Sequence, residues 1–218
     1  MATDSRAVLR IEAEGNIPLS SMRNFLEAFE NAYNSVYVFD VFITDPERLS
    51  PSEPFSSLLS AQPMALRVQL LAWVIATQPS AQEQIARLVP VGDRVILRAV
   101  HLGSPGHLDF EGLRDSLAAI QHFLGVFGQI LKLRKQADTV KTQRRKEELE
   151  NELLENHVIR ERIDMAMLAG ANPELVRMLA NRLVINSLAE LGHHEAHGTI
   201  TGVGPLEPGN GRYGQSHP

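Results

Sequence analysis

The sequence predicts an α+β fold: a small antiparallel sheet packed on helices, with a long projecting charged helix and a C-terminal helix. Residues 7–14 alternate between apolar and polar side chains, as a half-buried strand does, and residues 94–102 are rich in β-branched side chains. No proline occurs between Glu111 and Gly170, which favours one uninterrupted helix over 111–168. At about 1.5 Å per residue this helix is longer than a compact domain of this size, so part of it should project.

The N-terminal half predicts a helix, a loop and a second apolar segment. Pro18 suits a first helical turn, and apolar residues then recur every three or four positions to about Phe42. Residues 44–63 hold four prolines among several serines and predict a surface loop. The run 66–76 is apolar on nearly every face, so its pattern fits a buried strand or a buried helix. Its Leu, Ala and Gln content favours the helix, with Trp73 as a core anchor.

The C-terminal half predicts a hairpin and a last helix. The strand over 94–102 is followed by the turn GSPG (103–106) and a short returning strand over 107–110. Asn172 before Pro173 is a helix start, and Gly192 is expected to stop that helix.

The expected organisation is therefore an α+β head (5–133), a charged helical stalk or coiled coil (134–168), a C-terminal helix (172–191) and a tail (193–218). The tail has few apolar residues, so it is expected to be flexible.

Composition excludes several classes of site. The chain has no cysteine, which excludes disulfides, thiolate nucleophiles and cysteine-based metal centres. Its net charge of −5 gives no overall attraction to nucleic acid. The N-terminus lacks the pattern of a signal peptide, and no stretch is apolar enough for a membrane span, so a cytoplasmic location is expected. A chain with four lysines and many arginines suggests a GC-rich bacterial genome.

Charge is segregated along the predicted long helix. Residues 132–146 carry seven cations and one anion, whereas residues 147–155 carry five glutamates and no cation. A partner helix in antiparallel register would set each block against the other, with Arg144 opposite Glu147. The heptad-like positions of this oligomer interface are Leu133, Ala137, Val140, Arg144, Glu147, Asn151, Leu154 and Val158.

Three alternatives use the same region. It could be a single solvated helix, or it could pack against residues 173–191 of its own chain. The amphipathic segment 113–131, followed by lysines and arginines, also resembles a membrane-surface element, although burial of its apolar face in the core is the more ordinary interpretation. Its lipid contacts would be Lys132, Arg134, Lys135 and Lys141. Nucleic-acid binding is the weakest interpretation, because no aromatic residues interleave with the basic run.

Candidate chemical groups are few. The spacing of metal ligands occurs in one cluster, formed by His193, His194, Glu195 and His197. This cluster lies in the predicted tail, so we expect only an adventitious metal contact there. His101 and His107 flank the turn and could face each other, with Ser104 and Asp109 nearby. Asp109 and Glu111 are interpreted as acids at the entry of a helix.

We therefore expect no catalytic, cofactor or metal site. The sequence favours a non-enzymatic oligomerising or scaffold protein that forms a homo-oligomer or recruits a protein partner through its charge-segregated helix. A membrane-surface factor is the alternative. An enzyme with a site dispersed along the chain is the third hypothesis, because catalytic residues need not be neighbours in sequence.

Overall fold

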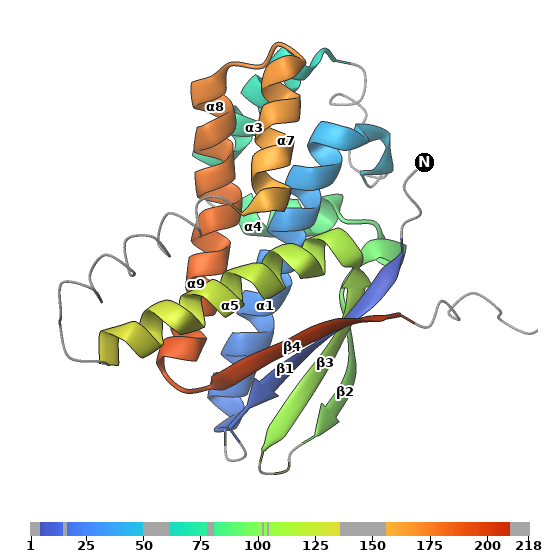
Figure 1. Ribbon diagram of the computed structural model, residues 1–218. Coiled ribbons are helices and arrows are strands. Elements are labelled where there is room, and N and C mark those ends of the chain that lie inside the picture. Colours follow the sequence, from blue (N-terminus) through green and yellow to red (C-terminus); the bar gives the residue numbers. More distant parts are fainter. Residues whose placement is uncertain are drawn as a thin grey trace, which may run out of the picture.

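A four-stranded antiparallel sheet organises the fold. The computed structural model describes residues 5–14, 17–49, 62–77, 81–101, 103, 105–135 and 156–209. In these residues the strand order is β2-β3-β1-β4, and helices cover one face of the sheet (Figure 1). The strands are β1 (Arg6–Ala13), β2 (Ile96–His101), β3 (Gly106–Leu113) and β4 (Ile200–Pro208). The predicted α+β class is confirmed.

The helices fall into an N-terminal set, a central helix and a C-terminal set. The first set is α1 (Leu19–Thr44), η1 (Pro46–Arg48), α3 (Met64–Thr77), α4 (Ala81–Leu88) and η2 (Val91–Asp93), and the central helix is α5 (Arg114–Lys135). The last set is α7 (His157–Leu168), α8 (Pro173–Leu179), the π-helical η3 (Ala180–Ile185) and α9 (Asn186–Ala196). The expected helix from Pro18 and the helical choice for residues 66–76 are both confirmed by α1 and α3.

The two faces of the sheet differ as the alternation in β1 predicts. Leu9 and Ile11 are fully buried on the face that meets the helices, opposite Phe110 and Leu108 of β3. Phe29 of α1 stacks on Phe110 with ring centroids 3.8 Å apart. On the other face Arg10 is exposed, so this outer face is polar. Burial of one face of β1 against aromatic side chains therefore holds the helical layer on the sheet.

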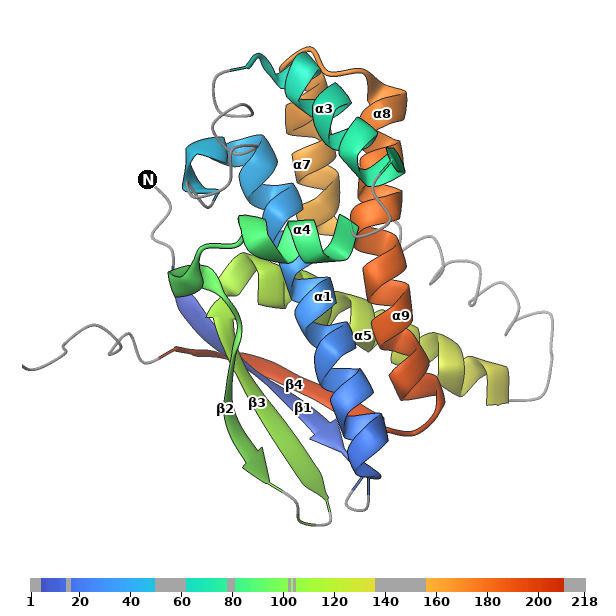
Figure 2. The ribbon, with the colours of Figure 1, turned by 180° about the vertical axis from the view of Figure 1, so that it is seen from behind.

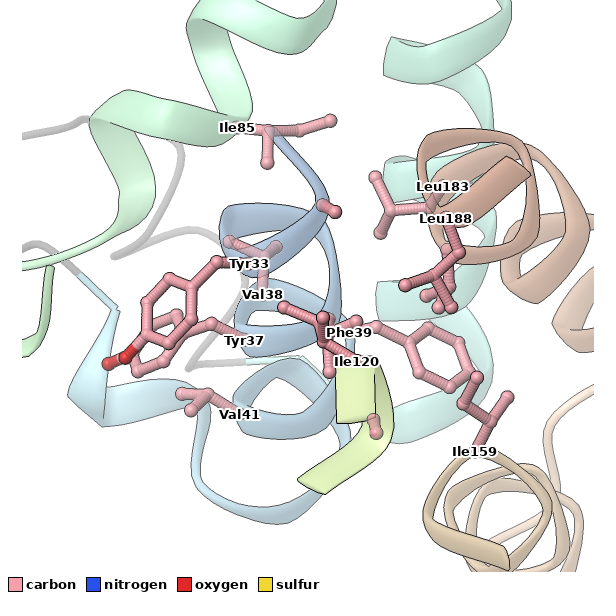
Figure 3. Packing of buried hydrophobic residues seen from close by; sticks show 14 of the residues in the cluster. Tyr33, Tyr37, Val38, Phe39, Val41, Ile85, Ile120, Ile159, Leu183 and Leu188 are labelled. Carbon is pink, nitrogen blue, oxygen red and sulfur yellow. The ribbon is translucent and has the colours of Figure 1, made fainter. Parts of the chain in front are cut away.

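A second part of the core lies where the far half of α1 meets the other helices. Phe39 points into it from α1 toward Ile159 and Leu188 (Figure 3), and the same buried cluster holds side chains from five further helical segments. These are Ile85 of α4, Ile120 of α5, Ile159 of α7, Leu183 of η3 and Leu188 of α9. Apolar burial thus joins the C-terminal helices to the N-terminal helix.

The expectation of one helix over residues 111–168 was wrong at its start and at Asn156, where the helix is interrupted, whereas its expected end agrees with the end of α7 at Leu168. Residues 111–113 belong to β3, where Glu111 accepts a hydrogen bond from Arg6 Nε at 3.1 Å. A new helix begins at His157, because the side chain of Asn156 caps it by accepting from the amide of Val158. Asn156 also donates to the carbonyl of Ala119 at 3.1 Å, which seats this cap against α5. The charged stretch 136–155 lies outside the described residues.

The expectation of a flexible tail from residue 193 was also wrong for much of its length. The last helix passes Gly192 and ends at Ala196, and residues 200–208 form β4. Ile200 of β4 is buried and lies opposite Ala13 of β1. The backbone bonds of β1 and a few apolar contacts therefore order a segment of polar composition. Trp73 is a third correction, because it is 60% exposed on α3 and is not a core anchor.

Candidate functional site

The predicted oligomer interface is only partly within the described residues. Leu133 lies near the end of α5 and Val158 in the first turn of α7. Val158 is partly buried against the core of its own chain, and its pairing with Leu133 of another copy stays a prediction. The remaining predicted positions lie outside the described residues, and their pairing stays a prediction. They are Ala137, Val140, Arg144, Glu147, Asn151 and Leu154.

The membrane-surface alternative depended on the apolar face of residues 113–131. In α5 this face is buried beneath the sheet and the other helices, with Leu117 and Ile120 fully covered. Gln121 of α5 also donates to the carbonyl of Gly204 at 2.7 Å, which fixes the helix against β4. Of the proposed lipid contacts, Lys132, Arg134 and Lys135 lie in the last turn of α5, and Lys141 is outside the described residues. Within the described part of the chain, every helix is too short or too polar to cross a bilayer.

The C-terminal histidines are positioned by the core. His194 packs edge-on against Phe25 of α1, with ring centroids 5.7 Å apart. His197 Nδ1 lies 2.7 Å from the carbonyl oxygen of His193. Across the residues that the structure describes, no three histidine or carboxylate side chains gather as a metal site would require. The histidine cluster is therefore part of the end of α9.

The contact of His194 with Phe25 gives a testable pH dependence. Burial lowers the pKa of His194, so the unfolded chain takes up a proton at a higher pH than the folded chain. The stability that neutral His194 contributes is present above its ordinary pKa and is lost progressively as the pH falls from that value through the lowered pKa of the folded chain. His194→Gln should reduce the fall in the urea midpoint between about pH 7 and about pH 5. His193→Gln, at an exposed neighbour, is the control. An unchanged pH profile in His194→Gln would contradict this assignment.

The β2–β3 hairpin confirms one predicted contact and corrects another. His101 and His107 lie opposite each other and stack with ring centroids 5.0 Å apart. Asp109 lies within β3, where Arg10 binds it through two hydrogen bonds of 2.8 and 2.9 Å. Asp109 and Glu111 are therefore partners of strand arginines and not acids at a helix entry. Ser104 lies outside the described residues.

A polar network surrounds Asp93, just before β2. Its carboxylate accepts hydrogen bonds from Tyr37 and from both Nε and Nη2 of Arg48, at 2.7 to 3.1 Å. Tyr33 donates to the carbonyl of Asp93 at 2.7 Å and accepts from the amide of Leu113. The network thus joins α1, η1, η2 and β3.

The titration behaviour of this network follows from its geometry. Burial raises the pKa of Tyr33 to about 12. Burial and the hydrogen bond to Asp93 raise the pKa of Tyr37 far above its usual range. Burial alone would raise the pKa of Asp93, but the hydrogen bonds from Arg48 and Tyr37 outweigh it and lower that pKa. Side chains with shifted pKa values can mark active sites. Here these side chains form hydrogen bonds with one another and hold the start of β2 in place.

The strand β2 is the most exposed apolar element of the sheet. All of its residues are exposed, including Ile96, Leu97 and Val100, which are 45%, 40% and 48% accessible. None of the described strands pairs with its free side, and no helix crosses it in either view (Figure 2). Such an edge presents unpaired backbone N–H and C=O groups together with apolar side chains.

The opposite edge of the sheet, β4, has features that discourage strand addition. Pro205 lies within it, and proline lacks the backbone N–H that a neighbouring strand would need. Its pairing with β1 contains two irregularities, and Gly202 and Gly204 offer no side chain for a partner to contact. β2 has no proline or glycine, so it is the open edge of this sheet.

Pairing with β3 assigns the side chains of β2 to the two faces. Leu97 lies opposite Phe110, and Val100 lies opposite Leu108, so both belong to the face that carries the helices. The pairing shifts between Leu97 and Ala99, which is a β-bulge at Arg98. As a result the two inner-face residues are three positions apart in the chain, where a regular strand would have two. Asp109 lies on the outer face, where the hydrogen bonds from Arg10 lower its pKa and the charge of Arg98 adds a smaller effect in the same direction.

Sequence reasoning found this strand but not its exposure. The run RVILRAVHL lacks alternation, which is typical of a strand covered on both faces. No protein-family model, curated protein or solved structure matches this chain.

Proposed function

We propose that this chain is a non-enzymatic assembly protein whose copies associate by strand addition at β2. The observation that carries the proposal is the exposed edge with Ile96, Leu97 and Val100. Edge strands of this kind bind extended segments through backbone hydrogen bonds, while side-chain contacts select the partner. The Asp93 network supports the proposal, because it holds the start of the edge in a fixed position before any partner binds.

The edge can be tested by sedimentation velocity over about 1 to 200 micromolar protein. The wild type is expected to sediment faster as concentration rises, and Leu97→Lys/Val100→Lys is expected to remain monomeric. Lysine at these positions would place charges against the added strand and leave them without water. A second variant, Leu97→Thr/Val100→Thr, keeps β-forming side chains but removes apolar surface, so it should associate weakly.

A matched control is available elsewhere on the surface. Leu19→Lys/Leu168→Lys changes two leucines that are 88% and 89% exposed and lie on helices. This control should associate as the wild type does. The proposal fails if the wild type is monomeric throughout, or if the edge variants associate as strongly as the control. Circular dichroism of each variant checks that the fold is retained.

The salt dependence of association distinguishes pairing at the β2 edge from the predicted pairing of the charged blocks. Association through residues 132–146 and 147–155 would weaken as sodium chloride rises, because salt screens charges beyond roughly 10 Å at 0.1 M. Association through apolar side chains and backbone bonds should be largely insensitive to salt. A salt-sensitive complex that is unaffected by the edge variants would support the charged blocks and overturn the role of β2.

A further inference from the structure

We infer that β2 pairs with β2 of a second copy and closes a two-fold dimer, in which the two sheets become one continuous eight-stranded sheet. This inference rests on the proposed function and names the partner surface for the same edge. It is carried by the bulge in β2, by the overlap of the strand with its own copy, by the local charges and by the character of the other edge.

The bulge in β2 sets the spacing of the inner-face side chains that a partner strand would contact. Leu97 and Val100 both belong to the inner face although they are three positions apart. A regular strand places side chains on one face at every second position, so it meets both residues only across a register shift, as β3 does on the other side of β2. A second copy of β2, running antiparallel, has the same spacing and meets both.

The register with the greatest overlap is also the one that matches these side chains. When Ile96–His101 pairs with itself along its full length, Leu97 faces Val100 of the second copy, and the reverse pair is formed at the same time. Both pairs lie on the inner face. Opposed apolar side chains on one face are the unit that stabilises neighbouring strands. Maximum backbone pairing and apolar contact therefore occur in one arrangement.

Charge is compatible with this register. Arg98 is the one formally charged residue of β2, and it would lie beside Ala99 of the second copy. The carboxylate of Asp109, which Arg10 of the same chain binds, also lies close enough to Arg98 to offset a small part of the repulsion between the two guanidinium groups on the outer face. No other formal charge of the strand enters the pairing.

Pairing of β2 with β4 of another copy is the main competing arrangement. It would join unlike surfaces and, unless it closed into a ring, would continue as an open filament. Pro205 and the irregular pairing of β4 disfavour it. The β2–β2 arrangement uses the same surface on both copies and stops at two.

The small size of the β2 edge limits the expected affinity of the dimer. Six residues from each copy form the pair, whereas a standard stable interface uses about 20–30 residues a side. The dimer should therefore be reversible, with a dissociation constant on the order of 10 to 100 micromolar.

The absence of cysteine allows the register to be tested by cross-linking. Leu97→Cys and Val100→Cys each introduce a single thiol. In the inferred register the two thiols face each other, whereas two copies of Leu97→Cys hold theirs displaced by about 10 Å along the strands. A disulfide requires Cα atoms within about 7 Å. Under mild oxidation, a mixture of the two variants should form about tenfold more disulfide dimer than either variant alone.

A third variant tests for the competing arrangement, in which β2 pairs with β4 of another copy. Thr201→Cys places a thiol on an exposed position of β4. Cross-links between Val100→Cys and Thr201→Cys, or species larger than a dimer in sedimentation, would overturn the two-fold register while leaving edge association in place. Equal cross-linking of the mixture and of Leu97→Cys alone would also overturn it. If the wild type does not associate at all, the proposed function itself fails.

Discussion

A chain that ends at His197 is expected to lose more than about 5 kcal/mol of its free energy of unfolding, because it lacks β4. This strand supplies the buried side chain of Ile200 and a row of backbone hydrogen bonds to β1. Its removal leaves those groups of β1 without partners and uncovers the inner face near Leu9 and Ile11. A loss of this size is comparable with the whole stability of a typical domain. Urea unfolding followed by circular dichroism measures it.

Two controls keep this test informative. A chain that ends at Gly209 retains all of β4 and is expected to unfold at the wild-type urea midpoint. Ile200→Ala keeps the strand but removes most of its buried side chain, and should cost about 3 kcal/mol. If the chain ending at His197 unfolds at the wild-type midpoint, β4 contributes nothing and the described sheet is wrong at that edge.

Asp93→Ala is expected to lower the free energy of unfolding by about 2 to 3 kcal/mol. It removes the acceptor for both hydrogen bonds of Arg48 and for the hydroxyl of Tyr37. The side chains of Arg48 and Asp93 are 23% and 19% exposed, so the ion pair is largely shielded from water. Arg48 would lose the carboxylate that its guanidinium group contacts through two nitrogen atoms. Urea unfolding at neutral pH is the measurement.

Two variants separate the ion pair from the loss of side-chain volume. Asp93→Asn keeps the shape and one acceptor, so its cost should lie between the wild type and Asp93→Ala. Asp164→Asn, at an exposed position of α7, should leave the midpoint unchanged. A loss below about 0.5 kcal/mol in Asp93→Ala would show that the network contributes little to stability.

The elements that could be predicted are those whose own residues carry a periodic signal. The alternation from Val8 to Glu14 identified β1, the apolar stripe after Pro18 identified α1, and Asn172 with Pro173 marked the start of α8. The buried faces of β1 and α1 and the helix cap of α8 can each be recognised from neighbouring residues in the sequence. Tertiary packing then reinforces what the local pattern favours.

The errors occurred where distant partners decide the structure. Glu111 became part of a strand because Arg6, far away in the sequence, binds it. Residues 200–208 look like a polar tail until β1 supplies their backbone partners. Asn156 could have been recognised as a helix cap, as Asn172 was, but the absence of proline and glycine nearby concealed the break.

The candidate site was predictable only in part. The β-branched run before Gly103 identified a strand, but it did not indicate that the strand would be exposed. Its place at the edge depends on the order of all four strands, which pairs β2 with β3 alone among the described strands. The bulge at Arg98 depends on that pairing and leaves no clear mark in the sequence.

The position of β1 between β3 and β4 constrains how the protein can fold during its synthesis. Ala7 pairs with Pro208, so the sheet joins residues from opposite ends of the sequence. The ribosome makes β1 before the described helices and β4 after them, so one side of β1 lacks its neighbour until β4 has been made. Contacts so distant in sequence close slowly, and an unpaired strand is prone to aggregate in the meantime. The nascent chain should therefore depend on chaperones that cover β1, and its yield should be sensitive to their supply.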